Sequence, residues 1–169
     1  MRKILFWFLL LFMAIACTKL PKETQEGKET FGCLVDGKKF IVKSNDGKDL
    51  QSLVASYDQI NHGIRIWANL YHGAVASGDK EEIFFLFNNY KLEIGRRQID
   101  NFNTITTYLY DVDGKTELYD KTSGYIEITH VDTVSTPKSI AGTFQFEAKS
   151  TAATREITKG RFDLMLRIY

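Results

Sequence analysis

Apolar and polar residues alternate with a period of two along most of the chain after residue 30. Residues 64–71, 144–148 and 162–168 each place one set of apolar side chains between mostly polar ones. Because successive side chains of a strand point to opposite faces, this pattern predicts half-buried β-strands. Ile83–Phe87 is apolar at every position, which predicts a central strand buried on both faces.

Two Asp-Gly pairs, which begin at Asp36 and Asp113, mark tight turns between such segments. A two-residue turn at each pair predicts these cross-strand partners: Cys33 with Phe40, Phe31 with Val42, Leu109 with Leu118, Tyr108 with Tyr119, and Tyr110 with Glu117. Further strands are predicted at Leu50–Tyr57, Tyr90–Ile94 and Tyr125–Val131. No long segment after residue 30 has helical periodicity. Residues 31–169 are therefore expected to form one antiparallel β-sandwich or barrel of about ten strands.

The first sixteen residues have the pattern of a targeting segment. Arg2 and Lys3 precede the apolar run Ile4–Ile15, which is shorter than the roughly 20 residues that a membrane-spanning helix needs. Small residues follow, and Ala14-Ile15-Ala16-Cys17 resembles a bacterial lipobox. We therefore expect residues 1–16 to be a cleaved signal peptide and Cys17 to be lipidated, because several acyl chains on one residue anchor a protein stably.

The chain after Cys17 is polar. Thr18–Thr30 has one aliphatic side chain, Leu20, among Lys, Glu, Gln, Gly and Pro. Residues 17–30 are thus predicted to be the lipidated cysteine and a flexible, solvated tether, whose extended reach would be about 40 Å. The expected location is the cell envelope, at the outer membrane, and the sequence leaves open whether the periplasmic or the outer surface displays the domain.

The net charge argues against a nucleic-acid partner, and the cysteine content limits thiol chemistry. Without Arg2 and Lys3, the 22 basic residues fall to 20, against 21 acidic residues. A near-neutral chain has no overall attraction for nucleic acid. Lipidation of Cys17 would leave Cys33 as the one free thiol, and its position opposite Phe40 on an apolar face predicts a buried, inert side chain.

Motifs for metal or covalent chemistry are weak. The three histidines are widely spaced in the sequence, and Asp111-x-Asp113-Gly114 and Asn45–Asp49 have the composition of turns rather than of complete calcium loops. No nucleophile elbow, phosphate loop or dinucleotide fingerprint occurs. The sequence therefore predicts no metal, cofactor or catalytic residue, although scattered acids leave little trace in a sequence.

Aromatic residues with polar groups are the candidate ligand or partner face. Strand parity groups Tyr108, Tyr110 and Tyr119 on one face of the middle hairpin, and Trp67 with Tyr71 on one face of residues 64–71. Such side chains suit binding surfaces. The alternative is that a second sheet covers these faces and the rings belong to the core.

The two ends of the domain carry a family resemblance. Residues 140–148 (IAGTFQFEA) and 157–163 (ITKGRFD) resemble the closing strand pair of a family of small Bacteroidota lipoproteins, and residues 31–38 (FGCLVDGK) resemble its opening hairpin. The family is of unknown function, so the resemblance implies a fold and a location and provides no catalytic residue.

Three functions fit these expectations. The first is a non-enzymatic binding or accessory module that presents loops or an aromatic face to a protein, a glycan or a small molecule. The second is an envelope hydrolase with an acid-based site. The third is a carrier whose barrel holds an apolar ligand.

Overall fold

The computed structural model describes residues 19–43, 53–71, 79–99 and 104–169, and the chain within them is all-β. Cys17 and the predicted signal peptide lie outside the described residues. The strands are β1 (Thr30–Val35), β2 (Lys38–Lys43), β3 (Leu53–Asp58), β4 (Gly63–Tyr71), β5 (Lys80–Phe87), β6 (Gly95–Ile99), β7 (Thr104–Val112), β8 (Lys115–Tyr119), β9 (Lys121–Asp132), β10 (Ser139–Lys149) and β11 (Thr154–Ile168). In these ranges there is no helix, and hence none long and apolar enough to cross a membrane.

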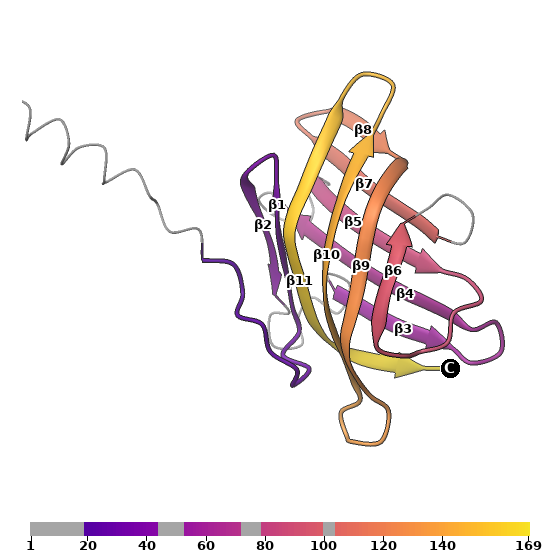
Figure 1. Cartoon of the computed structure of the whole chain (residues 1–169). Coiled ribbons are helices and arrows are strands. Elements are labelled where there is room, and N and C mark those ends of the chain that lie inside the picture. The colour runs from indigo at the N-terminus through magenta and orange to yellow at the C-terminus, as the bar shows by residue number, and fades with distance from the viewer. Residues whose placement is uncertain (1–18, 44–52, 72–78, 100–103) are drawn as a thin grey trace, which may run out of the picture.

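All strands join in one curled sheet, in the order β6-β9-β10-β11-β3-β4-β5-β7-β8, with β1 and β2 added at β11. Figure 1 shows the half built from β6, β9, β10 and β11 in front of the half built from β3, β4, β5, β7 and β8. The long strand β11 joins the halves, because Phe31 pairs with Phe162 near its middle and Ala55 pairs with Leu166 near its end. The core lies between the two halves.

The register predicted at both Asp-Gly turns is confirmed. Cys33 pairs with Phe40, and Tyr108 pairs with Tyr119. Asp36 and Asp113 themselves have positive φ angles of 49° and 55°, as each turn requires. One pairing departs from the antiparallel expectation, since β3 runs parallel to the end of β11.

One predicted strand is absent, and the burial predicted for another strand is wrong. Residues 90–94 form no strand, and the next strand, β6, covers Gly95–Ile99, whose three middle residues are polar. β6 pairs with β9 at the edge of the sheet, and its more covered positions are Gly95, Arg97 and Ile99, so one face mixes polar and apolar residues and no period of two is visible. Ile83–Phe87 is buried on one face alone: Ile83 and Phe85 are buried, whereas Phe84 and Leu86 are half-buried on the outer face.

Phenylalanine rings fill the middle of the core. Phe85 contacts both Phe144 and Phe146 edge to face, with ring centroids 5.2 and 5.6 Å apart. Glycines on neighbouring strands make room for these rings. Gly142 pairs with Phe162, and Gly160 pairs with Phe144. These pairs give a physical reason for the Gly-Thr-Phe and Gly-Arg-Phe stretches of β10 and β11, because a side chain at either glycine would occupy the space of a ring.

The segment predicted as a solvated tether instead docks on the sheet. Residues 21–29, here called the strap, have no regular structure but lie along the outer face of β11. Asp163, only 1% exposed, accepts hydrogen bonds from the Thr24 hydroxyl and from the backbone N–H groups of Glu26 and Gly27. A charged and polar composition predicts a solvated segment only if the folded domain offers its polar groups no binding partner. Here the buried Asp163 carboxylate binds the donors of the strap.

Candidate functional site

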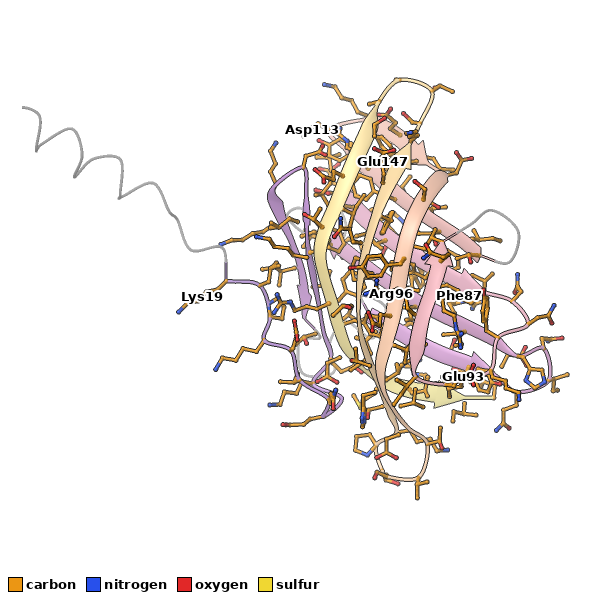
Figure 2. The ribbon with its side chains drawn as sticks, viewed as in Figure 1. Lys19, Phe87, Glu93, Arg96, Asp113 and Glu147 are labelled. Carbon is orange, nitrogen blue, oxygen red and sulfur yellow. The ribbon has the colours of Figure 1, made fainter. Side chains whose placement is uncertain are left out.

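The turns after β1, β7 and β10 lie at one end of the molecule (Figure 1). A polar pocket lies beside the turn after β1. Figure 2 labels Asp113 in the β7–β8 turn at this end. The pocket, of about 230 Å³, is called the tyrosine pocket here. Its lining includes Asp36, Lys38, Phe40, Glu81, Tyr108, Tyr110 and Arg155. These residues come from β1–β2, β5, β7 and β11, so both halves of the sheet contribute to one site.

Tyr108 and Glu81 connect the pocket to the core. The Tyr108 hydroxyl donates a hydrogen bond to Glu81 Oε2, while its ring is only 2% exposed. Burial, together with this hydrogen bond and the charge of Glu81, raises the pKa of Tyr108 far above its ordinary value. Tyr108 therefore stays neutral and donates its hydroxyl hydrogen. The Glu81 carboxylate lines the pocket with two oxygens that can accept hydrogen bonds.

At the other wall Arg155 links β11 to β8 and to the turn between β1 and β2. Its Nη1 donates to Asp36 Oδ2 at 2.8 Å, and its Nε donates to the Tyr119 hydroxyl at 3.0 Å. Tyr119 donates in turn to Glu117 at 2.7 Å. Because each member is held by another, the guanidinium is fixed in position before any ligand arrives.

The acids of this network remain charged. Partial burial pulls the pKa of Asp36 upward, but the Glu156 N–H and the Arg155 guanidinium outweigh that effect and hold it below its usual range. Hydrogen bonds from Ser150 and Tyr119 likewise lower the pKa of Glu117. The site thus offers a fixed cation, charged acceptors and aromatic rings, which is a set suited to binding.

The five predicted aromatic residues divide between the two faces of the sheet. Tyr108 and Tyr119 are buried, as the core interpretation held, but their hydroxyls belong to the network of the pocket. Tyr110 is half-buried and lines the pocket. Trp67 and Tyr71 lie on the outer face of β4, away from it, as their pairing with Phe84 and Lys80 shows. Trp67 is half-buried there, with its indole N–H enclosed.

Sequence reasoning missed the charged residues of the pocket and of its hydrogen-bond network, although a signal for them exists. Lys38, Glu81, Glu117 and Arg155 each stand two positions before a buried inward-facing residue: Phe40, Ile83, Tyr119 and Ile157. A charged residue that continues the inward register marks the point where a strand leaves the core. Four such residues predict a polar opening between the two halves of the sheet.

Metal and calcium interpretations find no support in the part of the chain that the structure describes. No three His, Cys, Asp or Glu side chains in these ranges come close enough together to hold a metal ion. Asp111 accepts a hydrogen bond from Thr116 within the β7–β8 hairpin. Asn45–Asp49 and His72 lie outside the described residues.

Cys33 is expected to resist thiol reagents in the folded protein. It is 0% exposed, and burial, with a contribution from the charge of Glu81, raises its pKa far above the ordinary value. Since the thiolate is the reactive form, labelling at neutral pH should be at least about a hundredfold slower than in urea. A disulfide reagent that releases a coloured thiolate on reaction measures both rates by absorbance. Equal rates would contradict both the burial and the inert role.

Comparison of the chain with family models, curated proteins and solved structures gives no match.

Proposed function

We propose that the protein is a non-enzymatic binding module of the cell envelope, anchored through lipidated Cys17 at the outer membrane, and that the tyrosine pocket takes its ligand. One observation carries the proposal. The pocket combines a hydrogen-bonded guanidinium, a carboxylate and two tyrosines, and these residues come from both halves of the sheet. Such pre-organised groups reduce the cost of ordering a site around a ligand.

A single sugar ring of a glycan is the ligand class that this pocket suits best. Sugar hydroxyls both donate and accept hydrogen bonds, so they match the Glu81 carboxylate and the Arg155 and Lys38 cations. The Tyr110 ring, half-buried at the wall, offers the apolar surface that a sugar's C–H face requires. The volume of about 230 Å³ accommodates one ring rather than an extended chain.

Two features favour binding over the alternatives. The middle of the sandwich is filled by phenylalanine rings in mutual contact, where a carrier would hold its apolar ligand. Asp36 is paired with Arg155 and its pKa is lowered, so it is a poor proton donor for an acid-based hydrolase.

Tyr110→Ala and Glu81→Gln should each weaken sugar binding by about tenfold, because the first removes the ring that contacts the sugar and the second replaces a charged acceptor by a neutral one, each worth roughly a kilocalorie per mole or more. Fluorescently labelled mature protein on a glycan array identifies the terminal sugar that binds. Calorimetry with that free monosaccharide then gives the affinity of each variant.

Tyr71→Ala is the matched control, since it removes the same ring from the outer face of the same half of the sheet. It should bind as the unchanged protein does. Loss of binding in Tyr71→Ala alone would move the site to the outer face. Cleavage of the glycan, detected as released sugar, would favour the hydrolase instead.

A further inference from the structure

Pro21, the first residue of the strap, contacts the sheet and lies only four residues after Cys17, the proposed lipid anchor. Pro21 sits over Gly32, where an added Cβ would meet the Pro21 ring at 2.7 Å, and its carbonyl accepts a hydrogen bond from Arg161 at 2.8 Å. At the other end of the strap, Glu29 accepts a hydrogen bond from the Met165 N–H. The chain is therefore fixed to β1 and β11 from Pro21 onward.

This docking shortens the link between anchor and domain. A free tether from Cys17 to Thr30 would reach about 40 Å, which would let the domain turn freely above a bilayer. From Cys17 to Pro21 there are four residue steps, so the docked strap leaves at most about 14 Å. The lipid surface must then lie beside Lys19, which points away from the sheet in Figure 2.

We propose that the strap holds the domain in one orientation, with the outer face of β1 and β2 near Pro21 against the lipid surface. The proposal rests on the lipidation of Cys17 in the proposed function. The exposed side chains of Lys19, just before the strap, and Lys22, near its start, face phospholipid headgroups, whereas the acidic Glu23 and Glu26 come after them. Cations beside an anionic leaflet strengthen this orientation.

The two reporter positions lie on the outer faces of strands in different halves of the sheet. Lys39 is exposed on the outer face of β2, opposite Leu34 and two residues from the pair Gly32–Ile41 beneath Pro21, and it also borders the tyrosine pocket. Leu118 is half-exposed on the outer face of β8, in the other half of the sheet. Lys39→Cys and Leu118→Cys, each made with Cys33→Ala, carry a fluorophore at these sites.

The experiment uses the lipidated full mature chain in vesicles of phosphatidylethanolamine and phosphatidylglycerol that contain a nitroxide-labelled lipid. The fluorophore at Lys39→Cys should be quenched severalfold more strongly than the one at Leu118→Cys. In the Asp163→Ala background, where the strap loses its buried acceptor, the two should become similar. Equal quenching with the strap intact, or stronger quenching at Leu118→Cys, would overturn the orientation.

Cys17→Ser separates this failure from failure of the anchor. If Cys17→Ser protein no longer floats with vesicles, the anchor stands and the reporters decide the orientation alone. If it floats as the unchanged protein does, lipidation at Cys17 is not the anchor, and the orientation proposal falls with it.

Discussion

Gly142→Ala is expected to destabilise the domain by about 3 kcal/mol or more, as overpacking at a site that cannot relax does. An ideal Cβ on Gly142 would stand 2.7 Å from Phe162 Cζ and closer still to the carbonyl oxygen of Glu127. The carbonyl belongs to the neighbouring strand β9, so relief requires the pairing of β9 and β10 to shift. Urea denaturation followed by tryptophan fluorescence measures the loss.

Gly160→Ala should also be destabilised by a steric clash, but here a second substitution should relieve the clash. A Cβ there would lie 2.6 Å from Phe144 Cγ, and all three of its nearest atoms belong to that ring. Phe144→Leu should therefore rescue part of the Gly160→Ala loss, giving a favourable coupling of about 1 kcal/mol in a double-mutant cycle. Phe162→Leu should not rescue Gly142→Ala, because the Glu127 carbonyl remains.

Gly63→Ala is the matched control for both. A Cβ on Gly63 would meet its nearest atom at 3.7 Å, an ordinary contact. Its free energy of unfolding should change little or rise by about 0.5 kcal/mol, because alanine restricts the unfolded chain. If all three glycine variants lost similar stability, the cost would come from strand propensity and the Gly–Phe interpretation would be wrong.

The architecture of this domain could be predicted because its strands have one covered face. Alternation in residues 144–148 identifies inward-facing rings directly, and an Asp-Gly turn fixes register to the residue. β6 could not be predicted in this way, since an edge strand with polar residues on both faces carries no period-two signal. The parallel pairing of β3 with β11 is set by the curl of the sheet, which a local pattern does not record.

The candidate site could be predicted in part. Parity placed Tyr108, Tyr110 and Tyr119 together, and they do meet at one end of the molecule. Arg155 and Glu81, which give the pocket its charge, lie 74 positions apart in the sequence and meet only through the fold. Trp67 and Tyr71 share a polar-lined strand face in the sequence, yet that face is turned away from the pocket.

The strap could not be predicted because its partner lies at the far end of the chain. Asp163 alternates with Phe162 and Leu164 as an ordinary outward-facing residue would. Only the structure shows that this outward position is 1% exposed beneath residues 24–27. Polarity therefore predicted the wrong environment both for Asp163 and for the strap, because the Asp163 carboxylate and the donors of the strap form hydrogen bonds with each other.

Asp163→Ala is expected to release the strap and to lower the free energy of unfolding by about 2 kcal/mol, because hydrogen bonds to a charged acceptor are worth roughly that much net. Three donors lose this acceptor at once. The loss should nevertheless stay limited, since the strap lies outside the sheet and its freed N–H groups can reach water. Trypsin should cut after Lys22 and Lys28 earlier in the variant, as mass spectrometry can show, while the β-domain still unfolds cooperatively.

Two further variants, one conservative change at Asp163 and one control in the strap, decide which interaction holds the strap on the sheet. Asp163→Asn keeps one acceptor oxygen without the charge, so its loss should fall between those of the unchanged protein and Asp163→Ala. Glu26→Gln alters an exposed side chain that pairs with Lys28, and it leaves the Glu26 N–H free to donate to Asp163, so strap cleavage should not change. Unaltered cleavage in Asp163→Ala would show that the Pro21 and Glu29 contacts hold the strap by themselves. Collapse of the whole sheet in that variant would instead make the carboxylate part of the folding core of β11, and the strap a consequence of it.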